Sequence, residues 1–283
     1  MPTPVSRLSG TFGRIPVRRP LLIGHLPAGY PTIEDSLTAL RALSRHVDIL
    51  GVDLPHPDLA PDNPAVHAAT RAALSAGITQ SDVIGVVREL TATVRIPVML
   101  MSPWAPIARS GPTNMAAALA AAGASGVVLP GLAPIGSGAT RWLHAARAHR
   151  LGTTFMAAGD YLPGAAAHST SWVYLPLVDE DETGGAEADN LLDLTRLRRR
   201  TLQLRQSTCA PICVGDGISS PSQAAEVVTM AQVDGIVIGS AFVRSLMYAR
   251  TFDQGITCLH RRARQYSQAL RPRRRRGKDR AVA

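Results

Sequence analysis

Short apolar runs alternate with longer amphipathic stretches along most of the chain. Such runs indicate strands, and apolar residues at helical spacing indicate helices. The predicted strands are 21–24, 47–53, 97–101, 126–129, 154–157, 173–177, 212–214 and 235–238. The predicted helices are 33–45, 64–75, 80–93, 113–122, 139–149, 190–207, 221–230 and one from residue 241 onward. The segment between the fifth and sixth strands is short and broken by Gly and Pro, so it predicts only one or two helical turns.

Eight strands with interleaved helices predict an α/β fold, a (β/α)8 TIM barrel. The 283 residues, 46% of them hydrophobic, suffice for one large core, so we expect a single domain. The expected organisation is a flexible N-terminal arm at 1–19, the barrel at 20–265 and a basic disordered tail at 266–283. In this fold, active sites lie at the C-terminal ends of the strands.

The formal net charge of +9 is concentrated at one end of the chain. Residues 271–280 hold seven basic residues and one acid, so six of the nine charges lie there and about three remain elsewhere. We therefore expect no nucleic-acid partner for the barrel. The tail is expected to be solvated, with weak contact to nucleic-acid or lipid phosphates as the alternative. The run RLRRR at 196–200 predicts a solvated outer face of its helix, with a subunit contact as the alternative.

Composition also excludes several classes of protein. The sequence contains no run of 18 consecutive apolar residues, so no membrane span is predicted. The N-terminus lacks the apolar region of a secretory signal. Cys209, Cys213 and Cys258 lack metal-ligand spacing, so we expect reduced thiols, a cytoplasmic location and no metal. Lys278 is the only lysine and lies in the tail. Schiff-base aldolases and pyridoxal-phosphate enzymes need a buried lysine, so both classes are excluded.

Two glycine-rich loops follow neighbouring strands near the end of the barrel. Strand seven is followed by GDGIS, which contains Asp216 and Gly217, and strand eight by Gly239 and Ser240 at the start of a helix. Glycines let backbone N–H groups approach an anion, and a helix N-terminus adds its positive dipole. The loops therefore predict binding of a phosphorylated small molecule, with Gly184 after strand six as a third element. The alternative is that these glycines serve tight turns alone.

Several stretches, in order and with matching spacing, resemble the family of tryptophan synthase α subunits. They are LIGHLPAGYPT, PHPDLAPDNPAVHAA, VMLMSPWAPI, ASGVVLPGLAP, VGDGISSPSQAAEV and DGIVIGSAFV. The resemblance implies a lyase of tryptophan biosynthesis that cleaves indole-3-glycerol phosphate to indole and glyceraldehyde 3-phosphate by a retro-aldol step without cofactor. It also implies a β-subunit partner that receives the indole.

The resemblance places this chemistry on two carboxylates with distinct roles. A strand-two glutamate moves protons at the indole carbon and the hydroxyl, and a loop aspartate hydrogen-bonds the indole nitrogen. The loop aspartate falls on Asp62, whereas the strand glutamate falls on Gly51. The resemblance further implies that Gly184, Gly217, Gly239 and Ser240 hold the phosphate and that Tyr174 lines the pocket.

Three interpretations follow from the missing glutamate. The base could be relocated: strand alternation places residues 51 and 53 on one side, so Asp53 is the first substitute and Asp216 the second. Asp53 could instead be a structural acid at the end of its strand. The second interpretation is a catalytically impaired phosphate-binding barrel that activates a β subunit. The third is a related lyase acting on another indole or sugar phosphate.

Overall fold

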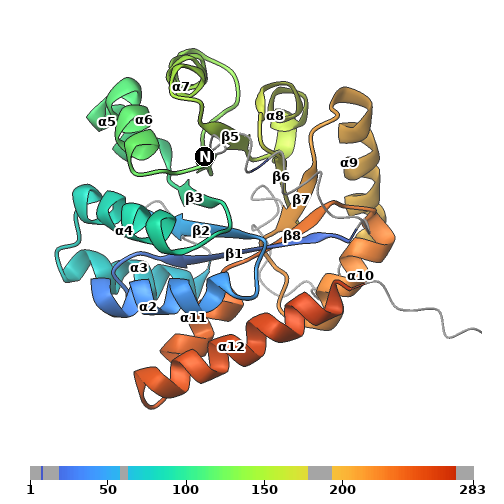
Figure 1. The fold of residues 1–283 in the computed structure, drawn as a ribbon. Coiled ribbons are helices and arrows are strands. Elements are labelled where there is room, and N and C mark those ends of the chain that lie inside the picture. The colour runs from blue at the N-terminus through green and yellow to red at the C-terminus, as the bar shows by residue number, and fades with distance from the viewer. Residues whose placement is uncertain (1–7, 9–18, 58–62, 178–192, 272–283) are drawn as a thin grey trace, which may run out of the picture.

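The barrel of parallel strands is the centre of the molecule (Figure 1). The computed structural model describes residue 8 and residues 19–57, 63–177 and 193–271. Its strands are β1 (Leu21–Pro27), β2 (Ile49–Asp53), β3 (Val98–Met101), β4 (Gly126–Leu129), β5 (Gly152–Phe155), β6 (Val173–Pro176), β7 (Ile212–Gly215) and β8 (Gly235–Ile238). The (β/α)8 TIM barrel that the sequence predicts is confirmed.

Helices surround the strands on the outside of the barrel (Figure 1). They are α2 (Ile33–Ser44), α3 (Pro64–Ser75), α4 (Gln80–Thr93), α5 (Trp104–Ser110), α6 (Pro112–Ala121), α7 (Ser137–Ala148), α8 (Leu162–His168), α9 (Leu194–Ser207), α10 (Pro221–Ala231), α11 (Ser240–Met247) and α12 (Phe252–Ala269), with a short 3-10 helix at Gly159–Tyr161. Among the described residues, none of these helices combines the length and apolar character needed to cross a bilayer.

Strand pairing runs without interruption from β5 through β1 and β8 to β6. The remaining seam, between β5 and β6, is closed by a single bridge between Met156 and Tyr174. Arg200 of α9 braces this seam, because its guanidinium donates to the carbonyl oxygens of Ala157 at 2.7 Å and Pro176 at 3.2 Å. These carbonyls lie at the ends of the two strands that the seam separates. The expectation that the arginine run forms only a solvated face is therefore wrong for Arg200, which is buried.

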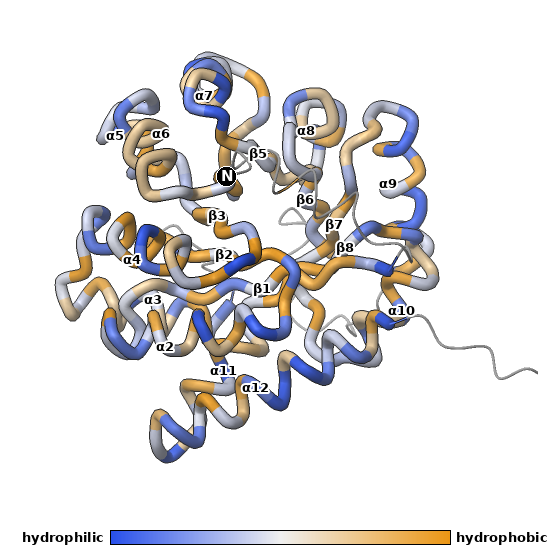
Figure 2. The backbone as a smooth tube through the Cα atoms, viewed as in Figure 1, coloured by the Kyte–Doolittle hydropathy of each residue, from blue (hydrophilic) through white to orange (hydrophobic). Residues whose placement is uncertain are grey.

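Two apolar layers follow from the alternation of side chains along the strands. The inner layer fills the barrel and includes Ile23, Ile49, Met99 and Trp172; the outer layer packs the strands against the helices. Leu8 is also buried in the inner layer. Figure 2 shows the result, with hydrophobic strands at the centre and helices that turn hydrophilic residues outward.

Most bounds lie within a few residues of the sequence predictions, and the larger differences concern three elements. β1 continues to Pro27 instead of ending at residue 24. α5 was not predicted as a helix. α12 ends at Ala269, and Tyr266 and Leu270 are buried, so barrel packing extends beyond residue 265. The one or two helical turns expected between β5 and β6 are present as the seven-residue helix α8.

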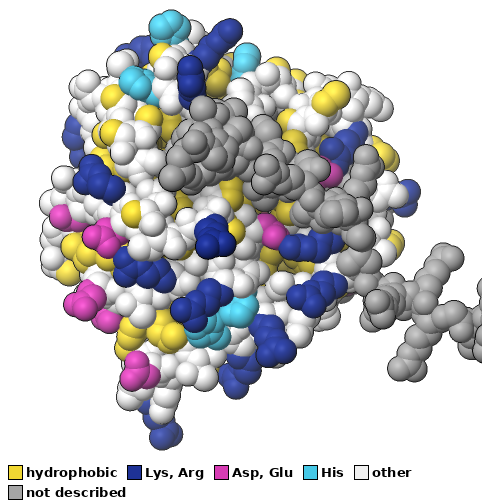
Figure 3. All heavy atoms as spheres, in the orientation of Figure 1, with side chains coloured by type: hydrophobic (Ala, Val, Ile, Leu, Met, Phe, Trp, Pro, Cys, Tyr) yellow, Lys and Arg dark blue, Asp and Glu magenta, His cyan; other side chains and the backbone are white. Residues whose placement is uncertain are grey.

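Charges of both signs are distributed over the outer helices. Figure 3 shows arginine side chains interspersed with acidic ones, and histidines among the arginines. Two of the histidines contact each other: Nε2 of His46 lies 2.8 Å from Nδ1 of His260 in α12. Burial, followed by the positive charges of His260, Arg264 and Arg45, lowers the pKa of His46.

Candidate active site

A histidine and an aspartate from neighbouring strands form the most buried ionisable pair at the mouth of the barrel. His25 of β1 places Nδ1 2.9 Å from each carboxylate oxygen of Asp53 at the end of β2. The side chain of Asp53 is 1% exposed and that of His25 is 12% exposed. Because the carboxylate can only accept, Nδ1 carries the proton and Nε2 is the free acceptor of the neutral ring.

Gly51 creates the space in which this pair lies. It stands directly opposite His25 in the β1–β2 register. A Cβ at residue 51 would lie 2.6 Å from the Cβ of His25 and 3.2 Å from the Sδ of Met101. Any side chain here would push β1 away from β2, so glycine permits the close approach. Gly51 and Asp53 share the inner side of β2, as alternation predicts.

A second polar pair lies across β8 from the first. The Tyr174 hydroxyl of β6 is hydrogen-bonded to the Asp216 carboxylate, which follows β7. Gly215 makes room for the tyrosine, since a Cβ at residue 215 would lie only 2.3 Å from its hydroxyl oxygen. Asp216 itself adopts a positive φ of 54°. Polar groups from β2, β1, β7 and β6 therefore form one row around the barrel mouth.

The groups in this row alter each other's protonation. Burial alone lowers the pKa of His25, but the nearby carboxylates of Asp53 and Asp216 raise it by more, so the net shift is upward. Burial raises the pKa of Asp216, against the opposing effects of the Tyr174 hydrogen bond and His25. The surface of Asp216 is solvent-exposed, yet the surrounding protein still desolvates its carboxylate. Burial also raises the pKa of Tyr174 well above its usual value.

The glycine loops lie next to this row. The ring of His25 lies against Gly239, because a Cβ at residue 239 would be 2.2 Å from both Cε1 and Nε2. Ser240 begins α11, and Gly217 has a φ of 100° that favours glycine. No described residue accepts a hydrogen bond from the N–H of Gly217 or Ser240. Neither of these two donors is thus committed to another described residue.

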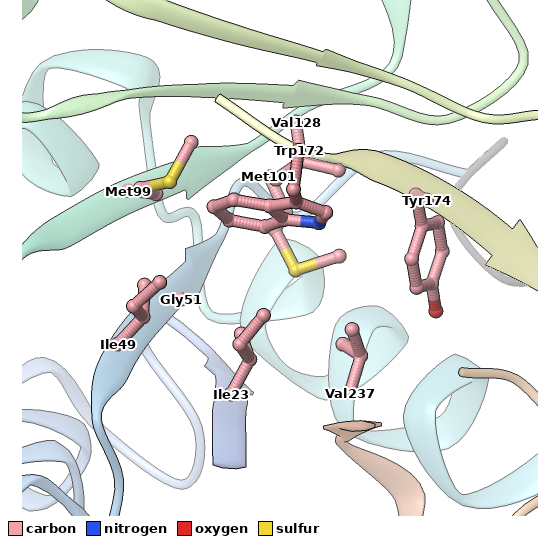
Figure 4. A pocket seen from close by; sticks show the side chains of 9 residues that line it. All are labelled: Ile23, Ile49, Gly51, Met99, Met101, Val128, Trp172, Tyr174 and Val237. Carbon is pink, nitrogen blue, oxygen red and sulfur yellow. The ribbon is translucent and has the colours of Figure 1, made fainter. Parts of the chain in front are cut away.

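Apolar side chains line the barrel deeper inside. They surround a cavity of about 10 Å³, which has room for roughly one water molecule. Figure 4 shows the Trp172 ring lying across this interior between Met101 and Val128, with Tyr174 at one side. Since Gly51 also lines the cavity, the polar row has an apolar floor.

Two residues of the predicted site, Asp62 and Gly184, lie outside the described residues. The structure places the other predicted residues together at one end of the barrel, namely Gly51, Asp53, Tyr174, Asp216, Gly217, Gly239 and Ser240. Among the described residues, no group of three or more His, Cys, Asp or Glu side chains could hold a metal ion.

His25 is the site residue that the sequence prediction missed. The apolar run ends at residue 24, so the predicted first strand does not include His25. Extending the alternation by one step would have revealed it, because Ile23 is an inward residue and residue 25 must then face inward too.

Fold and site together define a (β/α)8 barrel protein with a row of acid–base groups and glycine-rich loops at the C-terminal ends of its strands. Comparison with known sequences adds the family. The sequence profile of the tryptophan synthase alpha chain family matches residues 16–271. The tryptophan synthase alpha chain of Streptomyces avermitilis is 34% identical over 259 residues, covering 89% of this chain and 90% of its own length. That of Streptomyces coelicolor is 36% identical over 240 residues, covering 82% of this chain and 84% of its own length.

Solved structures agree with this assignment. The structure of tryptophan synthase from Mycobacterium tuberculosis superposes with a TM-score of 0.81 at 29% identity, covering 94% of this chain and 98% of the matched one. The chain belongs to the tryptophan synthase alpha chain family.

Proposed function

We propose that this chain is a lyase that cleaves indole-3-glycerol phosphate to indole and glyceraldehyde 3-phosphate in tryptophan biosynthesis. In this proposal the chain works beside a tryptophan synthase β subunit that consumes the indole. Membership of the alpha chain family supports the reaction. The observation within the molecule that carries it is the contact between His25 and Gly239, which places the acid–base row beside the glycine loop that follows β8.

The phosphate of the substrate is assigned to the amides of Gly217, Gly239 and Ser240. The dipole of α11 favours an anion at its N-terminus, and backbone N–H groups that point at an anion can donate to it. Gly184 is carried over from the family resemblance as a further phosphate contact. A phosphate here would leave the glycerol chain next to the polar row.

The indole end of the substrate is assigned to Asp62, again by family resemblance. Its carboxylate would accept a hydrogen bond from the indole nitrogen as positive charge develops there. On this chain the reaction still needs one group that gives a proton to indole C3 and takes one from the hydroxyl. Gly51 has no side chain to do so, and Asp53 is enclosed by His25.

The activity is tested by measuring indole release from indole-3-glycerol phosphate, with and without a tryptophan synthase β subunit. We expect indole and glyceraldehyde 3-phosphate in equal amounts. If glycerol 3-phosphate binds and β-subunit turnover rises, but no indole is released, the chain is an activator and the proposed cleavage is wrong. If indole-3-glycerol phosphate alone is left intact while another indole or sugar phosphate is cleaved, the substrate assignment is wrong.

The phosphate assignment predicts the effect of a charge at Ser240. Ser240→Asp adds an anion at the first residue of α11, where it favours the helix but repels phosphate. We expect the Kd for glycerol 3-phosphate, measured by calorimetry, to rise at least about tenfold. The control Ser240→Asn is similar in size and uncharged, and should change the Kd far less. Equal affinities for the two variants would move the phosphate away from α11.

A further inference from the structure

A histidine occupies the region from which the family's strand-two carboxylate would act. Gly51 and His25 face each other across β1 and β2 at a separation that admits only one Cβ. A glutamate at residue 51 and the observed position of His25 therefore exclude each other. The glycine that replaces the expected glutamate at residue 51 therefore leaves the space that His25 occupies.

We propose, on the basis of the lyase function above, that His25 is the catalytic acid and base of this chain and that Asp53 is its positioning residue. Asp53 binds Nδ1 with both oxygens at 2.9 Å, which fixes the ring and directs its other edge away from β2. That edge, with Nε2 and Cε1, lies against Gly239. It is thus next to the amides assigned to the substrate phosphate.

The proton transfers balance with one imidazole and no cofactor. Protonated His25 donates its Nε2 proton to indole C3, which leaves the indole ring as an iminium cation. Neutral Nε2 then accepts the proton of the hydroxyl on the adjacent side-chain carbon. The O–H electron pair forms the aldehyde C=O, the C–C bond to indole breaks, and its electrons return to the ring. Indole and glyceraldehyde 3-phosphate result, and His25 is again protonated.

The surroundings of His25 suit this order of steps. Asp53 from β2 and Asp216 from the loop after β7 face the ring, and Tyr174 from β6 binds Asp216. Both carboxylates stabilise the imidazolium that begins the cycle. His25 remains partly accessible, at 12% exposure, whereas Asp53 is nearly inaccessible at 1%. Contact with the substrate therefore falls to the histidine.

The test compares His25→Gln with wild type in steady-state cleavage of indole-3-glycerol phosphate. We expect kcat to fall by about 10²–10⁴, as for loss of a general acid–base group, with a smaller change in KM. His144→Gln removes an exposed histidine from α7 and serves as the matched control. Circular dichroism melts of both variants establish whether they fold.

Three results would overturn the proposal. Unchanged kcat would leave His25 a packing residue. Unchanged kcat with KM or the glycerol 3-phosphate Kd raised tenfold or more would make it a cation for the phosphate. Absence of cleavage by wild type would overturn the lyase function itself, and with it the proposal. When wild type does cleave the substrate, either of the first two results overturns the role of His25 and leaves the lyase function standing.

Asp53→Asn tests whether Asp53 acts on the protonation of His25, because loss of a merely structural residue would not shift the pH profile of kcat. Without the neighbouring carboxylate, the pKa of His25 falls, so activity that requires the imidazolium is lost at lower pH than in wild type. We expect this shift in the pH profile of kcat, and a parallel shift in the NMR titration of the His25 ring, identified by its absence in His25→Gln. Asp253→Asn, at an exposed residue of α12, is the control. Coincident profiles for wild type and Asp53→Asn would contradict the pairing.

Discussion

The barrel is closed in two different ways on its two sides. Around β1, the strands pair continuously with β2 and β8, and glycines at 51 and 239 let His25 fit between them. At the seam between β5 and β6, one bridge replaces the ladder and Arg200 reaches in from α9 to bind two carbonyls. Packing around β1 therefore depends on glycines, which have no side chain, whereas the seam depends on the long side chain of Arg200.

The difference separates positioning from support. On the β1 side, tight packing fixes a histidine within hydrogen-bonding distance of its aspartate, as acid–base chemistry requires. On the seam side, a buried cation satisfies carbonyls that have no strand partner, which is a requirement of stability. Changes at the seam should therefore affect folding, whereas changes near β1 should affect folding and catalysis together.

The largest effect on stability is expected at the seam. Arg200→Met keeps an unbranched apolar stem but removes the hydrogen bonds to Ala157 and Pro176. Losing bonds from a charged donor to buried carbonyls should lower the free energy of unfolding by about 3 kcal/mol. Urea unfolding followed by circular dichroism measures this. Arg199→Met, an exposed change on the same helix, should remain within about 0.5 kcal/mol of wild type; equal losses would show that Arg200 does not support the seam.

A smaller effect is expected from filling the gap beside β1. Gly51→Ala places a Cβ 2.6 Å from that of His25, and such overpacking should cost about 1–3 kcal/mol. It should also lower kcat by displacing His25 from Asp53. The matched change Gly85→Ala lies within α4, where an added Cβ meets nothing within 4 Å. It should stabilise the chain by about 0.5–1 kcal/mol with kcat unchanged. Effects of the same sign at both residues would refute the packing argument.

Sequence patterns predicted most of the fold because periodicity reflects which face of each element is buried. The strands at 126–129 and 235–238 and the helices at 64–75 and 80–93 have the predicted bounds. Alternation also placed Gly51 and Asp53 on one side of β2. These features depend on neighbours along the chain, so the local pattern contains them.

Contacts across the barrel could not be obtained in the same way. The His25–Asp53 bond joins residues 28 positions apart, and it depends on the register of β1 against β2. Helical spacing places Arg200 on the same face of α9 as Leu197 and Leu204, but only the position of the seam gives its guanidinium two carbonyls to bind. A local pattern can give the face on which each residue lies, but the contacts that His25 and Arg200 make depend on three-dimensional pairing.

The smallest effect should appear in the pH dependence of stability. The pKa of folded His25 is raised above its usual value of 6.5. Its contribution to stability is therefore fully present below the unfolded pKa and is lost as the pH rises through the folded one. We expect the free energy of unfolding of wild type relative to His25→Gln to be largest at about pH 5.5–6, below the unfolded pKa, and to fall as the pH rises through the folded pKa. Taking this difference cancels other histidines such as His46, whose pKa is lowered and whose linkage has the opposite sign. In the Asp53→Asn background the dependence should shrink, because the charge that raises the pKa is gone. A difference that stays constant with pH would mean that folding does not stabilise the imidazolium, and would remove the electrostatic link between His25 and Asp53.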